Sequence, residues 1–142
     1  DPIDTDELKG NEPDDGYPVL LRDWVRRDGL KCLKVKLRGT DWDWDFERMK
    51  KIGDIASKEG VQWLSADFNC TVNDPEYVNS VLDSIASDCP ETFKKILYVE
   101  QPFPYELKDN QIDVHSVADR KPLYLDESAH DWGCLWDGMG LL

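Results

Sequence analysis

The sequence has no long hydrophobic run and few basic residues. No apolar stretch approaches the roughly 18 residues that span a bilayer, and the acidic opening DPIDTDELKGNEPDDG has no signal-peptide character. Only 17 Lys and Arg stand against 30 Asp and Glu, which leaves a net charge of −13. The clustered positive charge that binds nucleic acid or an anionic membrane is missing. We therefore expect a cytoplasmic protein with no nucleic-acid partner and no membrane partner.

Paired cysteines are also absent. The four cysteines are scattered without a C-x-x-C pair, which excludes a zinc knuckle and a disulfide framework, and we interpret all of them as free thiols: Cys32, Cys70, Cys89 and Cys134. What is present is 142 residues with 40% hydrophobic content, enough for one domain with a core. Residues 1–17 are acidic and show no periodicity, so they predict a loop or arm.

From residue 18 onward, helical and strand patterns alternate. Asp45 and Asp74 are the expected N-caps of two of the helices, and Trp42 or Trp44 is expected in a loop that shields a site. The helical patterns cover 17–29, 45–60, 74–89 and, more weakly, 109–120, the strand patterns cover 30–39, 61–69, 96–103 and 121–128, and 133–142 resembles the start of another unit. The period of about thirty residues is the size of a βαβ unit and predicts a parallel sheet.

Each expected strand is apolar along its body and polar at its carboxyl end. Carboxyl ends of parallel strands meet at one edge of a sheet, where α/β enzymes place their active sites, so we expect lysines to face carboxylates there. Gathered carboxylates repel one another unless a cation neutralises them, and oxygen donors favour Mg²⁺, or Mn²⁺, over Zn²⁺. The alternative is that the acids cap helices and the lysines guard a sheet edge. The polar pairs are Lys34 and Lys36, Asp67 and Asn69, Glu100 and Gln101, and Asp126 and Glu127.

The two lysines lie two residues apart in LKVKLRG, so they share one face of their strand. A lysine acts as a base only when its amine is neutral part of the time. A neighbouring cation favours the neutral amine, which gives a chemical reason for the pair.

The ordered set KVK, DFN, VEQP and DES resembles the enolase superfamily in its mandelate racemase and muconate-lactonizing enzyme branch. The resemblance covers nearly all of the chain after residue 18 and implies a partial (β/α)₈ TIM barrel, an α/β fold. The acid Asp126 is more similar to the muconate-lactonizing subgroup, whereas DFNCTV departs from the more polar, glycine-containing run of many members. The implied roles are Mg²⁺ ligands for Asp67, Glu100 and Asp126, general base for Lys36, contact with the substrate carboxylate for Lys34, and substrate or supporting contacts for Asn69 and Glu127.

The resemblance implies a Mg²⁺-dependent isomerase or lyase, such as a racemase, epimerase, cycloisomerase or dehydratase. Such an enzyme removes the α-proton of a small-molecule carboxylate and forms an enediolate, whose two adjacent negative oxygens a metal stabilises. The alternative is a catalytically silent, metal-binding or structural α/β module.

A complete barrel needs roughly 250 residues, whereas residues 18–142 supply about four β/α units. We expect the first half of the barrel domain of a longer, homo-oligomeric enzyme, inactive as a piece. The other interpretation is a half-barrel whose open edges are covered by a second copy.

Overall fold

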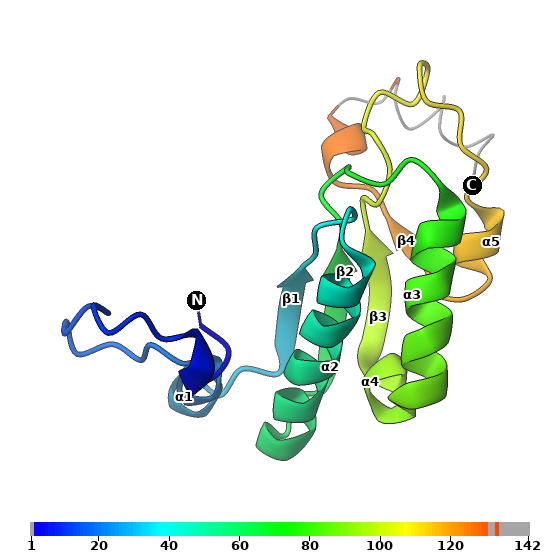
Figure 1. Cartoon of the computed structure of the whole chain (residues 1–142). Helices are drawn as coiled ribbons and strands as arrows, with labels where there is room; N and C mark the ends of the chain where they lie inside the picture. The colour runs from blue at the N-terminus through cyan, green and yellow to red at the C-terminus, as the bar shows by residue number, and fades with distance from the viewer. Residues whose placement is uncertain (1, 131–132, 134–142) are drawn as a thin grey trace.

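The computed structural model describes residues 2–130 and Gly133, and its centre is a four-stranded parallel sheet (Figure 1). The strand order follows the sequence, and all three neighbouring pairs are parallel, as predicted. Of the predicted further unit at 133–142, all but Gly133 lies outside the described residues, as does Cys134. The strands are β1 (Cys32–Lys36), β2 (Trp63–Asp67), β3 (Ile96–Glu100) and β4 (Leu123–Tyr124).

Most helices lie where the sequence predicts them. The exceptions are α4, whose six residues are too short to show a helical period, and α5, which is one turn instead of a longer helix. The sequence does not predict the short 3₁₀ helices η1 and η2 either, and η2 begins inside the predicted strand 121–128. None of the helices in the described ranges is long and apolar enough to cross a membrane. The helices are η1 (Thr5–Glu7), α1 (Leu21–Asp28), α2 (Trp42–Glu59), α3 (Pro75–Asp88), α4 (Pro90–Lys95), α5 (His115–Ala118) and η2 (Glu127–Ala129).

The start of α2 differs from the prediction. Asp41 is the N-cap, and its carboxylate accepts a hydrogen bond from the Trp44 amide at 3.2 Å. Asp45, the predicted cap, lies inside the helix and is fully buried. Trp42 and Trp44 therefore belong to the first helical turn, and the prediction of a shielding loop is wrong.

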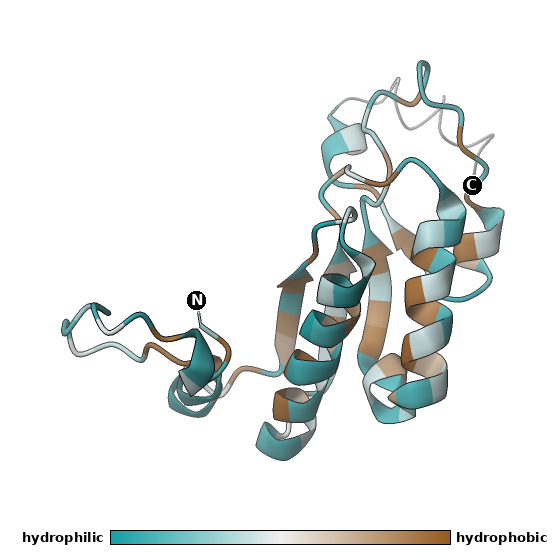
Figure 2. Ribbon diagram, viewed as in Figure 1, coloured by the Kyte–Doolittle hydropathy of each residue, from teal (hydrophilic) through white to brown (hydrophobic). Residues whose placement is uncertain are grey.

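The core lies between one face of the sheet and the helices α2 and α3, which Figure 1 shows packed side by side in front of the strands. Val35, Ala66 and Val99 are neighbours across β1, β2 and β3, and all three are buried. In Figure 2 hydrophobic colour runs along the strands and alternates with hydrophilic colour on both helices. The amphipathic helices thus cover the apolar face of the sheet.

The N-terminal arm packs against this layer through residues 3–7. Ile3 is 1% exposed and belongs to the core, and the Glu7 carboxylate pairs with Arg48 of α2 at 3.3 Å. Between these anchors and α1 the chain loops out beyond β1 (Figure 1).

Because side chains alternate along a strand, the register that buries Val35 and Ala66 turns their neighbours to the opposite face. That face carries Lys34, Lys36, Asp67 and Glu100. It also carries Tyr124, which is 50% exposed.

Candidate functional site

The carboxyl ends of β1, β2 and β3 bring two lysines and two carboxylates together. Lys36, Asp67 and Glu100 are neighbours across the three strands. The Lys34 ammonium donates to Glu100 Oε1 at 2.5 Å and lies 3.0 Å from Asp67 Oδ2. The Lys36 ammonium donates to the same Asp67 oxygen and, at 2.6 Å, to Asn69 Oδ1. The prediction that the lysines face carboxylates is confirmed.

Because the two carboxylates are buried, the stability of this cluster depends on the two lysines that compensate their charge. Asp67 is 1% exposed and Glu100 3%, whereas the side chains of Lys34 and Lys36 are 42% and 57% exposed. Buried carboxylates are costly unless cations and hydrogen bonds compensate them. Two ammonium groups offset two carboxylates here, so the four side chains together are neutral.

The pKa shifts follow from these contacts. Burial by itself raises the pKa of Asp67, but the hydrogen bonds from Lys36, Lys34 and the Asn69 amide outweigh it and leave that pKa below its usual value. The hydrogen bond to Glu100 raises the pKa of Lys34 against the opposing effect of burial. Asp67 is therefore ionised and Lys34 protonated at neutral pH.

Asn69 links the first two strand ends. Its backbone φ is +52°, a left-handed conformation that Asn adopts more readily than most residues. The Asn69 amide donates to Asp67 Oδ1 at 2.8 Å, while its side-chain oxygen accepts from Lys36. One turn residue thus fixes both a candidate ligand and the candidate base.

The acids after β4 lie apart from this cluster. β4 ends at Tyr124 beside Glu100, so Asp126 follows two residues beyond that row, is exposed and precedes η2. Within residues 2–130 and 133, no three or more His, Cys, Asp and Glu side chains form a group that could hold a metal ion. The structure therefore gathers Asp67 and Glu100 but does not join Asp126 to them, and its ligand role stays a prediction.

Cys70 connects the loop after β2 with the loop after β4. Burial, the charge of Glu127 and a hydrogen bond between the Cys70 side chain and Glu127 raise the pKa of the thiol to about 11, and the charges of Asp67 and Asp126 act in the same direction. The thiol is therefore protonated at neutral pH. The sequence predicts no role in the site for Cys70, although it lies in DFNCTV, the segment that differs from many members of the family that the sequence resembles.

Asp45 holds the turn after Lys36, and the prediction that it is a helix cap is wrong. Its carboxylate accepts hydrogen bonds from the Arg38 amide (2.7 Å), the Gly39 amide (2.8 Å) and the Tyr77 hydroxyl (2.8 Å). These bonds fix the turn that follows Lys36. The only sequence signal is an acid on the apolar side of a helix.

The cluster suits a hard divalent cation at two of the three predicted ligand positions. The carboxylates of Asp67 and Glu100 already converge on one cationic group, the Lys34 ammonium. Carboxylate donors of this kind suit Mg²⁺ or Mn²⁺ rather than Zn²⁺.

The sequence matches no protein-family model. It also matches no curated protein. Solved structures do match. A mandelate racemase/muconate lactonizing protein from Herpetosiphon aurantiacus is 24% identical with a TM-score of 0.64, over 82% of this chain and 31% of that one. Muconate cycloisomerase from Pseudomonas fluorescens is 18% identical with a TM-score of 0.53, over 78% of this chain and 27% of that one.

Muconate lactonizing enzyme from Pseudomonas putida is also 18% identical, with a TM-score of 0.51 over 79% of this chain and 28% of that one. The chain thus spans less than a third of each of these structures. At this identity the similarity establishes the fold. The predicted fold, a partial (β/α)₈ barrel of about four parallel β/α units, is confirmed.

Proposed function

We propose that the chain is part of a Mg²⁺-dependent isomerase or lyase of the enolase superfamily, in its mandelate racemase and muconate-lactonizing branch. The observation that carries the proposal is the cluster of Lys34, Lys36, Asp67 and Glu100 at the carboxyl ends of parallel strands. Barrel enzymes assemble their active sites at that edge. The activity belongs to the whole protein, because this chain spans less than a third of the structures it matches.

In the proposed reaction the protein removes the α-proton of a small-molecule carboxylate. Lys36, the last residue of β1, is level with Asp67 and Glu100. Its ammonium donates to Asp67 and Asn69, so Lys36 would first release a proton to solvent, and the neutral amine would then take the α-proton of the substrate. Lys34 lies two residues deeper and binds the substrate carboxylate.

Asp67, Glu100 and Asp126 would hold Mg²⁺. When bound, the ion would neutralise the carboxylates that now engage the lysines and would stabilise the charge that develops on the substrate oxygens. Asn69 keeps Lys36 beside Asp67. Glu127 would supply a substrate or supporting contact, since its charge acts on Cys70 in the loop that follows Asp67.

Calorimetry of Mg²⁺ binding to the full-length protein tests the ligand assignment. Asp67→Asn, Glu100→Gln and Asp126→Asn should each weaken binding by about tenfold or more, because each removes an anionic oxygen ligand. Unchanged affinity in all three variants would refute the assignment.

Exchange of the substrate α-proton with deuterated solvent tests the lysines. Lys36→Ala should abolish the exchange, whereas Lys34→Ala should mainly raise KM. The reverse pattern would exchange the two roles.

A second candidate is a catalytically silent α/β module. It is favoured by the neutrality of the cluster, whose lysines and carboxylates already satisfy one another. A native full-length protein that releases no heat on Mg²⁺ titration and gains no thermal stability from Mg²⁺ would support this candidate over the enzyme.

A further inference from the structure

Gln101, at the end of β3, is a buried residue whose side chain makes four hydrogen bonds. It is 1% exposed. Its Oε1 accepts from the amides of Asp126 (3.0 Å) and Ser128 (3.1 Å). Its Nε2 donates to the Phe103 carbonyl (3.0 Å) and to Ser128 Oγ (2.8 Å). A carboxamide has two acceptor sites and two donor protons, so its full capacity is used.

The backbone of Gln101 connects the neighbouring strand ends. Its amide donates to the Tyr124 carbonyl at the end of β4 (2.9 Å), and its carbonyl accepts from the Cys70 amide after β2 (2.8 Å). Its φ is +33°, a conformation that side-chain-bearing residues rarely adopt. A strained backbone of this kind persists only where the surrounding contacts hold it in place. In this conformation the Gln101 side chain faces the loop after β4.

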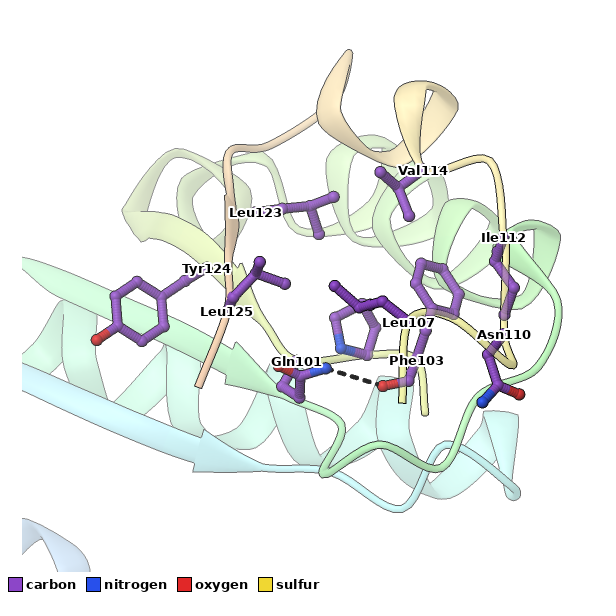
Figure 3. Close-up of a pocket in the computed structure, with 10 residues that line it drawn as sticks. Gln101, Phe103, Leu107, Asn110, Ile112, Val114, Leu123, Tyr124 and Leu125 are labelled. Carbon is purple, nitrogen blue, oxygen red and sulfur yellow. Dashed lines mark hydrogen bonds between the residues drawn. The ribbon is translucent and has the colours of Figure 1, made fainter. Parts of the chain in front are cut away.

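The surroundings of the carboxamide are apolar. Figure 3 shows Gln101 beside Leu107, Phe103 and Leu125, with its bond to the Phe103 carbonyl dashed. These residues line a hollow of about 30 Å³. Hydrogen bonds in such a place are strong, and an amide that loses its partner there has little water to replace it.

We propose that Gln101 is a positioning residue for Asp126. Its side chain accepts a hydrogen bond from the backbone amide of Asp126 and so fixes the position of the backbone that carries the Asp126 carboxylate. Asp126 depends on this support because it is exposed and lies beyond the two residues of β4. The inference rests on the proposed function, in which Asp126 is a Mg²⁺ ligand. Mg²⁺ tolerates little deviation from its ligand geometry, so a small displacement of Asp126 should lower affinity.

The test is calorimetric Mg²⁺ affinity of the full-length protein, at a temperature where every variant is folded. Gln101→Met keeps the length of the side chain and removes all four hydrogen bonds. Binding should weaken about tenfold, the lower end of what the loss of a residue behind a metal ligand costs. Asn79→Ala is the control, because Asn79 is 3% exposed and bonds Ser116 of α5 instead of the loop after β4. Its affinity should stay within about twofold of native.

A double-mutant cycle with Asp126→Asn separates this inference from the proposed function. If Gln101 acts through Asp126, Gln101→Met should weaken binding no further in the Asp126→Asn background. Unchanged affinity in Asp126→Asn alone would overturn the ligand assignment itself. If Asp126→Asn weakens Mg²⁺ binding but Gln101→Met keeps native affinity, only the positioning role is overturned. The same conclusion follows if Gln101→Met weakens binding equally in the native protein and in the Asp126→Asn variant.

Ser128→Ala and hydrogen exchange keep the inference testable if Gln101→Met does not fold. Ser128 Oγ accepts from Gln101 and donates to the Tyr105 carbonyl (2.9 Å), so its loss loosens the carboxamide without removing it. We expect faster exchange of the Asp126 amide proton and Mg²⁺ binding about threefold weaker, since one of four bonds is lost. Native exchange at Asp126 together with native affinity would overturn the inference.

Discussion

Replacing Lys34 by methionine is the most direct test of the charge balance in the cluster. The substitution keeps an unbranched apolar stem and removes a cationic group that contacts both buried carboxylates. Glu100 then loses the Lys34 ammonium, whereas Asp67 retains the Lys36 ammonium and the Asn69 amide. The variant should be less stable, because it leaves a buried charge that is poorly compensated.

The expected loss of stability depends on how far the lysine and the carboxylates are buried. Removing one partner of a fully buried pair costs about 3–5 kcal/mol, whereas an exposed pair contributes about 0–1 kcal/mol. The carboxylates are nearly inaccessible, but the Lys34 side chain is 42% exposed and therefore partly screened. We expect a loss of about 2–3 kcal/mol in the free energy of unfolding at pH 7.

This loss should depend on pH in a defined direction. Asp67 has a lowered pKa in the folded protein, so its contribution to stability is present above its ordinary value of 3.8 and is lost as the pH falls. Lys34 has a raised pKa, so its contribution is present below its ordinary value of 10.5 and is lost as the pH rises further. The difference between native protein and variant should therefore be largest near neutral pH and shrink in acid.

Urea unfolding followed by tryptophan fluorescence, with EDTA present, measures this difference. Lys94→Met is the matched control, because Lys94 pairs with Glu91 at 2.6 Å but both side chains are mostly exposed, 69% and 73%. The control should change stability by less than about 0.5 kcal/mol. Equal losses in Lys34→Met and Lys94→Met, or a Lys34→Met loss that grows in acid, would refute the reasoning.

Three further outcomes are expected. Asp45→Asn should lower the free energy of unfolding in urea by about 2–4 kcal/mol, because the new amide NH₂ would face N–H and O–H donors from which the buried carboxylate accepts hydrogen bonds. A loss below about 1 kcal/mol would contradict the importance of these hydrogen bonds. Gly39→Ala should lower the melting temperature more than Gly29→Ala, since both have positive φ but only at Gly39 would the added Cβ overlap a threonine side chain; equal shifts would contradict this. Iodoacetamide at pH 8, mapped by mass spectrometry, should label exposed Cys32 before Cys70, whose raised pKa of about 11 keeps it a thiol; the opposite order would contradict its assigned surroundings.

Local signals explain why most of the fold could be predicted. Asp74 and Pro75 begin α3 as their positions indicate, because capping and proline geometry depend only on adjacent backbone. At α2 two acids four residues apart, Asp41 and Asp45, both suit a cap. The choice is decided by tertiary partners, because the Asp45 carboxylate accepts hydrogen bonds from the turn after β1 and from the hydroxyl of Tyr77, which is distant in sequence.

The residues of the site likewise fall into those that local patterns predict and those that depend on partners distant in sequence. The lysines and the acids of β2 and β3 could be predicted, because strand alternation and parallel pairing place them on one face. The role of Gln101 depends on the loop after β4, about twenty-five residues later, and no spacing rule connects the two. The left-handed backbone of Gln101 is equally invisible in sequence, because only its surroundings impose it.

The proposed ligands therefore differ in how firmly the fold holds them. Asp67 and Glu100 are adjacent strand residues, fixed by sheet pairing and by the lysines whether or not any ion binds. Asp126 follows a strand of two residues, and its amide donates to the Gln101 side chain. Differences in Mg²⁺ affinity should then come mainly from the loop after β4, because sheet pairing already fixes the positions of Asp67 and Glu100. Replacement of Gln101 should for that reason weaken metal binding, in addition to the stability lost with its buried hydrogen bonds.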